Sequence, residues 1–223
     1  MRKMKIKIDE LLSLEKTIAK NLFMNIEKPW EAIPQIPKFI IELGKELPVE
    51  KYDRLEKDIW VAKTAKISAT ACLNGPVIID ECAEIRHCAY IRRNVIIGKN
   101  AVVGNSTELK NAILFDGVQV PHYNYIGDSI LGYKAHMGAG SITSNVKSDK
   151  SIIKLLYKGE KIDTGLKKFG AIIGDYVEVG CNSVLNPGTV IGKNSSIYPL
   201  CSVRGFVEPN SIYKSDSVIV EKA

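Results

Sequence analysis

A histidine stands in a segment whose other residues mainly repeat a simple pattern. His122 lies between Pro121 and Tyr123. An imidazole has an ordinary pKa of about 6.5, so it can accept a proton from an amine at neutral pH. Further along, the turn Gly138-Ala139-Gly140 can present backbone N–H groups to an oxyanion. Together these residue types suit acyl transfer from a thioester to an amine.

The same segment also supplies cations and hydrogen-bonding side chains. Arg92 and Lys110 can hold an anionic group such as a sugar phosphate and so position the amine. A single histidine beside proline and tyrosine is more often structural. Its combination with Lys110, Tyr125 and Asn145 favours a functional role for His122. His87 lies in an ordinary repeat, so a structural role is the simpler interpretation.

The elements that must position these residues follow a six-residue repeat from Ile59 onward. Aliphatic residues recur without a slip at Val61, Ile67, Leu73, Ile79, Ile85, Ile91, Ile97, Val103 and Leu109, and again at Ile173, Val179, Leu185, Ile191, Ile197 and Val203. Neither the period of an α-helix nor plain alternation predicts this spacing. Hexapeptide repeats are typical of a parallel β-helix, in which three units form a triangular coil of about 18 residues. The sequence therefore predicts an all-β fold whose coils stack cooperatively.

The repeat has two interruptions. The spacing falls to five residues within the run Val120, Ile126 and Leu131, and we expect this slip to bracket His122 and to re-aim side chains there. The hexads stop at residues 147–170, where alternation around Lys158-Gly159 predicts a protruding hairpin. Its lysines indicate either a solvated loop or a basic flap over an anionic ligand. Residues 206–223 are expected to cap the stack.

The first 58 residues are expected to form a helical segment, followed by a β-helix domain over residues 59–223 with 147–170 as an insertion. A helical pattern covers Ile8–Ile26. A short second helix begins at Pro29 and is interrupted by Pro34 and Pro37, and the stretch Phe39–Leu43 that follows ends at Gly44, its expected C-cap. The segment is predicted to pack on the body of the protein; the alternative is an arm that binds a partner.

Composition excludes several classes of protein. The chain has 223 residues, 45% of them hydrophobic, and a net charge of +6. Its lysines are not interleaved with stacking aromatic residues, so nucleic acid is not an expected partner. No apolar run is long enough for a membrane span, and the start has no signal-peptide core. Five cysteines without a CxxC pair predict reduced thiols in the cytoplasm.

Three segments carry a resemblance to a known family. IRRNVIIGKNAVVGNSTELKN, PHYNYIGDSILG and MGAGSITSN resemble the acetyltransferase half of the bifunctional glucosamine-1-phosphate acetyltransferase and N-acetylglucosamine-1-phosphate uridyltransferase family, over roughly Ile59–Gly205. The resemblance implies a left-handed β-helix, a homotrimer with sites between subunits, and acetyl-CoA or another acyl-CoA as co-substrate. The implied acceptor is an amino sugar, its phosphate or its nucleotide.

The resemblance also implies roles for matched residues. His122 corresponds to the general base, and Asn145 to an asparagine that binds substrate at the catalytic centre. The other expected substrate contacts are Arg92, Lys110, Tyr125, His136 and Lys168, and the expected acetyl-CoA contacts are Gly138, Ala139, Gly140 and Cys181. Three features depart from the family. His136 replaces an asparagine, the hairpin replaces a shorter loop, and no nucleotidyltransferase domain precedes the repeats, so that activity is not expected from this chain.

Two other functions compete with acyl transfer. A scaffold or regulator could keep the β-helix and bind a sugar phosphate or sugar nucleotide without catalysis. A zinc enzyme of the γ-carbonic-anhydrase type needs three histidines, two of them five residues apart. The residue five positions after His122 is Gly127, so no metal site is predicted.

Overall fold

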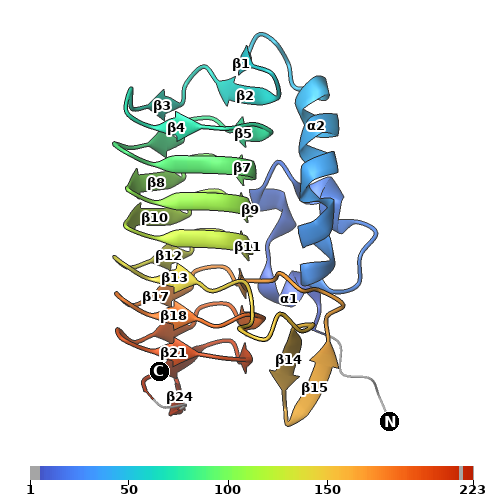
Figure 1. Ribbon diagram of the computed structural model, residues 1–223, viewed down its shortest axis with the longest axis vertical. Coiled ribbons are helices and arrows are strands. Elements are labelled where there is room, and N and C mark those ends of the chain that lie inside the picture. The colour runs from blue at the N-terminus through green and yellow to red at the C-terminus, as the bar shows by residue number, and fades with distance from the viewer. Residues whose placement is uncertain (1–5, 216–217, 223) are drawn as a thin grey trace.

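The computed structural model describes residues 6–215 and 218–222, and most of them form short strands stacked in a column (Figure 1). Parallel neighbours lie 18 residues apart, as in Ile79↔Ile97, Ile85↔Val103 and Ile91↔Leu109. This is the triangular coil that the six-residue repeat predicts. As the chain descends in Figure 1 the coils wind in the left-handed sense, so the predicted fold class is confirmed.

The strands form two large sheets and a hairpin. The first sheet contains β1 (Tyr52–Glu56), β2 (Ile59–Ala62), β4 (Cys72–Leu73), β5 (Val77–Ile79), β7 (Tyr90–Ile97), β9 (Glu108–Leu114), β11 (Tyr125–Leu131), β13 (Ile142–Thr143), β16 (Ala171–Ile173), β18 (Val184–Leu185), β19 (Thr189–Ile191), β21 (Ser202–Val203) and β22 (Phe206–Val207). The second contains β3 (Lys66–Ile67), β6 (Glu84–Ile85), β8 (Val102–Asn105), β10 (Gln119–His122), β12 (His136–Met137), β17 (Glu178–Val179), β20 (Ser196–Ile197), β23 (Ser211–Tyr213) and β24 (Ile219–Glu221). Long strands of the first sheet bend at a corner, so the two sheets supply the three sides of the prism.

One side of the prism is buried on both faces by the N-terminal segment. Here the outward-pointing Ile96, Ile113 and Ile130 have no exposed surface. The α2 helix (Ile36–Glu46) lies against β5, β7 and β9, as Figure 1 shows. Phe23 also meets Phe115 edge to face, with ring centroids 5.9 Å apart. The segment therefore packs on the body of the protein.

The prediction of one helix over Ile8–Ile26 is wrong. The structure has α1 (Ile8–Leu11) and two 3₁₀ turns, η1 (Leu14–Lys16) and η2 (Lys20–Phe23). The Ser13 hydroxyl donates to Asp175, and the Thr17 hydroxyl accepts the Ala19 N–H at 3.1 Å. These bonds compete with helical hydrogen bonds, so the apolar residues reach the prism from several short turns instead of one continuous helix.

Gly44 does not end its helix, contrary to the prediction. The 3₁₀ turn η3 (Pro29–Gln35) leads into α2, which passes Gly44 and ends at Glu46. Pro37 lies in the first turn of α2, where a missing N–H is tolerated. A Cβ atom at Gly44 would lie 2.5 Å from the ring of Trp60. Glycine is therefore present because the helix touches the Trp60 ring, not because the chain turns there.

The five-residue spacing predicted within the run Val120, Ile126 and Leu131 is present at Ile126–Leu131, but the prediction that the slip brackets His122 is wrong. The five-residue sides are Leu109–Leu114 and Ile126–Leu131, as the pairings Ile97↔Leu114 and Leu114↔Leu131 show. Val120–Ile126, the side that contains His122, keeps six residues. Relative to β9, the β7 strand has one extra residue, which forms a bulge between Ile91 and Arg93. The β9 and β11 strands are both shortened, so they pair without a bulge. The shortened sides carry Lys110, Asn111 and Asp128.

The inserted hairpin is confirmed. The β14 strand (Lys154–Tyr157) pairs antiparallel with β15 (Glu160–Asp163). The turn is at Lys158-Gly159, where both residues have positive φ, as a tight two-residue hairpin requires. Tyr157 packs on Phe206 with ring centroids 4.5 Å apart, so the hairpin rests on the lower coils (Figure 1).

The last coil ends with β24 pairing antiparallel to β23, in the region expected to cap the stack. Residues 1–5, 216–217 and 223 of the expected N-terminal segment and cap lie outside the described residues. Within the part of the chain that the structure describes, no helix is long and apolar enough to cross a membrane.

Candidate functional site

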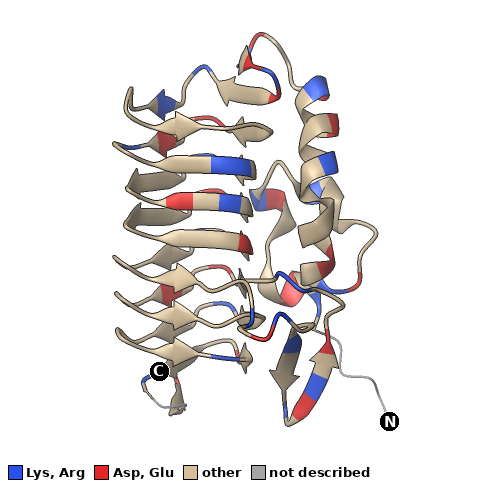
Figure 2. Cartoon of the chain, viewed as in Figure 1, with Lys and Arg blue, Asp and Glu red and all other residues tan. Residues whose placement is uncertain are grey.

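The predicted site residues lie mainly along one side of the prism that the N-terminal segment leaves uncovered. We call it the open face and define it by Tyr90, Glu108, Tyr125 and Ile142, which are stacked in register on successive coils. Charged residues of both signs lie next to one another on β7, β9 and β11 (Figure 2). Predicted residues gather at the two corners that border this face.

The first of these, the His122 corner, is built by main-chain stacking. His122 is the last residue of β10, and its carbonyl accepts the Gly140 N–H at 3.0 Å. One coil further on, the Ala139 carbonyl accepts the Asn182 N–H at 2.9 Å. His122, Ala139 and Cys181 therefore occupy the same corner on successive coils.

This corner leaves the groups needed for chemistry accessible. The His122 side chain is exposed, and its imidazole has no hydrogen-bond partner among residues 6–215 and 218–222. A Cβ atom at Gly138 would lie 2.7 Å from the Cys181 nitrogen, so glycine permits this close approach of two coils. The Ala139 N–H has no acceptor within the described chain, whereas that of Gly140 is used by His122.

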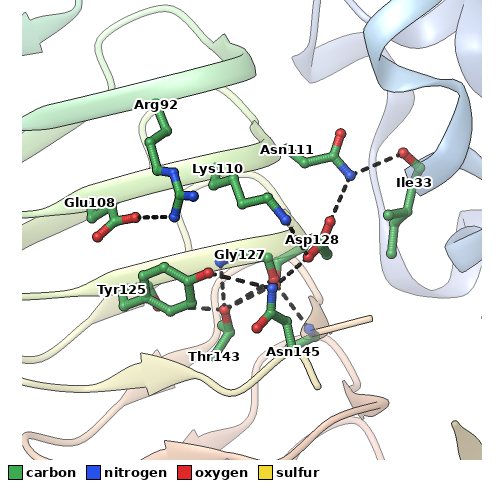
Figure 3. A network of polar contacts seen from close by, with 12 residues as sticks. Ile33, Arg92, Glu108, Lys110, Asn111, Tyr125, Gly127, Asp128, Thr143 and Asn145 are labelled. Atoms are coloured by element: carbon green, nitrogen blue, oxygen red, sulfur yellow. Dashed lines mark hydrogen bonds and ion pairs between the residues drawn. The ribbon is translucent and has the colours of Figure 1, made fainter. Parts of the chain in front are cut away.

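The second corner holds a polar network around Asp128, drawn in Figure 3. Its carboxylate accepts from Lys110 Nζ at 3.2 Å and from Asn111 Nδ2 at 2.9 Å. Asn145 Nδ2 also donates to it. The Asp128 side chain is only 5% exposed, so these bonds form in a desolvated place where they are strong. The structure thus brings Lys110 and Asn145 together through a carboxylate.

Two further predicted residues complete the open face. Arg92 Nη1 donates to Glu108 Oε1 at 2.9 Å, and this bond raises the pKa of the guanidinium. The phenol of Tyr125 accepts from Asn145 Nδ2 at 3.4 Å. Burial raises the pKa of Tyr125, and the charge of Asp128 adds to that effect. Both predicted anion-binding residues, Arg92 and Lys110, therefore have carboxylate partners within the chain.

His136 and Lys168 lie apart from these groups. His136 is in β12 on the second sheet, where its Nδ1 is 2.7 Å from Glu178 Oε2. The structure does not bring it to Lys110 or Asn145 of the same chain. Lys168 is exposed after the hairpin, and the next residue, Phe169, donates its N–H to the Asn145 carbonyl at 3.0 Å. Lys168 is therefore at the edge of the network.

Sequence reasoning missed Asp128. A signal was present, because Asn94, Asn111 and Asp128 recur once per coil, and all three adopt positive φ at the same corner. Asparagine and aspartate tolerate this conformation better than most residues. Only the last of the three is a carboxylate, and it is the one that faces Lys110.

The residues that the structure describes include no group of three His, Cys, Asp or Glu side chains placed to hold a metal ion. The zinc-enzyme alternative gains no support from the arrangement within one chain.

Comparison with known proteins gives several matches. The family model described as the GMPPB C-terminal domain matches residues 73–179. The bifunctional protein GlmU of Methanococcus vannielii is 39% identical over 118 residues, which are 52% of this chain and 28% of that protein. A bifunctional sugar-1-phosphate nucleotidylyltransferase/acetyltransferase of Sulfurisphaera tokodaii is 37% identical over 94 residues, 42% of this chain and 23% of that protein.

Among solved structures, the acetyltransferase domain of PglB from Neisseria gonorrhoeae FA1090 has a TM-score of 0.36 and 12% identity, covering 80% of this chain and 62% of that one. The curated relatives are much longer than the matched region, which spans about 28% of the M. vannielii protein. The repeat region of this chain is related to the bifunctional GlmU proteins, and the family resemblance indicated by the sequence is confirmed.

Proposed function

We propose that the chain is an acyl-CoA-dependent transferase that acetylates the amine of an amino sugar, its phosphate or its nucleotide. One observation carries the proposal. The exposed imidazole of His122, which has no hydrogen-bond partner within the described part of the chain, lies at the same corner as Ala139 one coil further on, beside a face that bears Tyr125 and the Asp128 network. The relationship to bifunctional GlmU proteins supports the same chemistry.

The residues at the two corners have different roles in the reaction. His122 takes a proton from the acceptor amine as its nitrogen forms a bond to the thioester carbonyl carbon. The Ala139 N–H stabilises the oxyanion, and the sulfur of CoA leaves as the carbonyl re-forms. Arg92, Lys110 and Lys168 hold an anionic group of the acceptor, while Tyr125 and Asn145 contact its sugar. Gly138, Gly140 and Cys181 line the acyl-CoA side, and His136 reaches the site of a neighbouring subunit in a homotrimer.

The alternative is a non-catalytic protein that binds a sugar phosphate or sugar nucleotide. The exchange of an asparagine for His136 favours it, because His136 lies with Glu178 on the second sheet, apart from Lys110 and Asn145 of the same chain. The ion pairs of Arg92 with Glu108 and of Lys110 with Asp128 bear on both functions alike, because any anionic ligand must compete with a carboxylate at each cation.

A CoA-release assay across amino sugars, their phosphates and nucleotide sugars tests the proposal. We expect release with one acceptor class, and a fall of at least about 100-fold in kcat for His122→Ala, the usual effect of removing a general base. His87→Ala is the matched control, since His87 lies on the same edge but is bonded to Thr70 at 2.7 Å. Wild-type rates in His122→Ala would refute the role of His122. Ligand binding without release for every acceptor would favour the alternative.

A further inference from the structure

A groove of about 640 Å³ is lined by the inserted hairpin, by the segment that precedes it, and by Pro187 and Arg204 of the lower coils. Its exposed apolar lining residues include Ile152 and Leu156, and its basic ones are Lys147, Lys154, Lys161 and Arg204. This volume is within the range of small-molecule sites in proteins.

The alternation of side chains along the two hairpin strands places the hairpin's lysines in this groove. Leu155 is completely buried and, with its cross-strand partner Ile162, occupies the opposite face of the hairpin. Side chains point alternately to the two faces of a strand, so Lys154, Leu156 and Lys161 share the groove face. Leu156 and Lys161 are also direct cross-strand neighbours, which places an apolar and a basic group side by side.

Most of the positive charge here is uncompensated. Lys154 and Lys161 have no acidic partner among the described residues, and Arg204 donates to a neutral group, Asn186 Oδ1, at 3.1 Å. Lys147 pairs with Asp149 at 3.2 Å. Asp163 is the single carboxylate that lines the groove, and it accepts the Gly165 N–H at 2.8 Å. A group with more than one negative charge is the natural complement of this surface.

The groove continues toward the open face. A smaller hollow of about 320 Å³ shares Lys147 and Arg204 with it and extends to Ser144 and Val146. These two residues flank Asn145, whose side chain belongs to the Asp128 network. A ligand could therefore occupy the groove while another part of it reaches the proposed acceptor site.

We propose that the groove binds a nucleoside diphosphate group, with the nucleoside against Ile152 and Leu156 and the phosphates on Lys154, Lys161 and Arg204. The place of this group in a reaction rests on the proposed function, because either a sugar-nucleotide acceptor or an acyl-CoA donor could supply it. The binding itself does not depend on turnover.

Calorimetry on the full chain tests the binding with UDP, GDP, dTDP, ADP and adenosine 3′,5′-bisphosphate as probes. The double substitution Lys154→Gln/Lys161→Gln should weaken the best-bound probe by at least about tenfold, since charge-assisted contacts are lost. Lys150→Gln/Lys167→Gln is the matched control, because it removes the same charge from the same insertion outside the groove. It should leave the affinity unchanged.

Two results would overturn the proposal: no probe binds the wild-type protein, or both double variants bind equally well. The source of the group follows from kinetics on the same variants. A rise in KM for a sugar nucleotide alone identifies the acceptor, and a rise for acyl-CoA alone identifies the donor. If no acceptor gives CoA release, the proposed function fails while the calorimetry still decides whether the groove binds nucleotides.

Discussion

Asp128 shows how one buried carboxylate can organise a surface site. It receives hydrogen bonds from Lys110, Asn111 and Asn145, and the amide of Asn111 also donates to the Ile33 carbonyl of the N-terminal segment at 3.3 Å (Figure 3). A carboxylate can accept all of these bonds, because ionised oxygens only accept. The position of Lys110 on the open face is therefore fixed by a residue that does not itself need to contact the ligand.

Replacing Asp128 by asparagine should loosen this network without changing the backbone. Asn111 adopts the same positive φ one coil earlier, so the amide fits the corner. The substitution removes the charge opposite Lys110 and turns one acceptor into a donor that faces another donor. We expect the free energy of unfolding to fall by about 1.5–3 kcal/mol and the KM for the acceptor to rise. Denaturant unfolding and steady-state kinetics measure the two effects.

Asp53→Asn is the control for this change. Asp53 is exposed and lies 3.9 Å from Lys63 in a surface ion pair, so its loss should alter stability by less than about 0.5 kcal/mol. An Asp128→Asn protein as stable as the Asp53→Asn protein would contradict the role of the network.

Asp116 provides a test of pH dependence. Burial raises the pKa of its carboxyl group, and the charge of Asp80 acts in the same direction. The folded state therefore binds this proton at a higher pH than the unfolded state, whose carboxyl has a pKa of about 3.9. Wild type gains stability as the pH falls through the raised pKa, and the gain is complete below about 3.9.

Asp116→Asn removes that proton-binding group. Its stability relative to wild type should be highest at pH 7 and should decline as the pH is lowered toward 4, because only wild type takes up the proton. Urea unfolding of both proteins at several pH values measures the difference, in which the other titrating groups cancel. A difference that does not vary with pH would refute the raised pKa.

At the scale of elements, the α2 helix depends on one close contact. Alanine normally stabilises a helix interior by about 0.5–1 kcal/mol relative to glycine. At Gly44 the new Cβ would lie 2.5 Å from the ring of Trp60, which is 5% exposed and cannot move aside freely. We expect the clash to dominate, so that Gly44→Ala lowers the free energy of unfolding by about 1–3 kcal/mol.

Chemical denaturation measures this effect, with Lys45→Ala as the control at the next, exposed position of the same helix. That variant should stay within about 0.5 kcal/mol of wild type. If Gly44→Ala were instead more stable than wild type, intrinsic helix propensity would outweigh the contact with Trp60.

The repeat was readable from sequence because each inward corner needs an aliphatic residue at a fixed interval. Ile79, Ile97 and Leu114 stack as that rule requires. The N-terminal segment was not readable to the same degree. Its apolar residues are buried against the surface of the β-helix, so they do not need a continuous helix to be buried. Hydrogen bonds of the Ser13 and Thr17 hydroxyl groups therefore interrupt the helix that the apolar spacing predicts.

The sequence nominated residues for the candidate site, but it did not predict how they are arranged. The stacking of coils places His122 and Ala139 at one corner. The pairing of Arg92 and Lys110 with carboxylates was not foreseen, because it depends on which side chains become neighbours across coils. The repeat slip was assigned to His122, although the shortened sides belong to the corner of Asp128. The spacing of aliphatic residues along the chain gives the length of each side of a coil. Which corner is displaced by a shortened side depends on how the strands of adjacent coils pair.

For the whole molecule, the three sides of the prism differ in what covers them. The N-terminal segment buries one side, the open face carries the Asp128 network, and the helices in the described part of the chain lie away from the second sheet (Figure 1). Between these last two sides the His122 corner exposes large side chains, including Tyr123 and Leu200. Leu200 is 79% exposed and has a positive φ, a conformation that disfavours branched and bulky residues. In the proposed homotrimer, whose sites lie between subunits at the His122 corner, Leu200 lies in the contact with a second copy of the chain.

The proposed trimer therefore depends on this corner, and Leu200→Glu should weaken it. A buried charge without a partner costs several kcal/mol, so the variant should elute as a monomer at micromolar concentration while wild type is trimeric. Light scattering coupled to size-exclusion chromatography gives the mass of each. Val49→Glu is the matched control, since Val49 is 82% exposed after α2, away from this corner. A monomeric wild-type protein, or a Leu200→Glu protein that stays trimeric, would show that the sites do not form between subunits at the His122 corner.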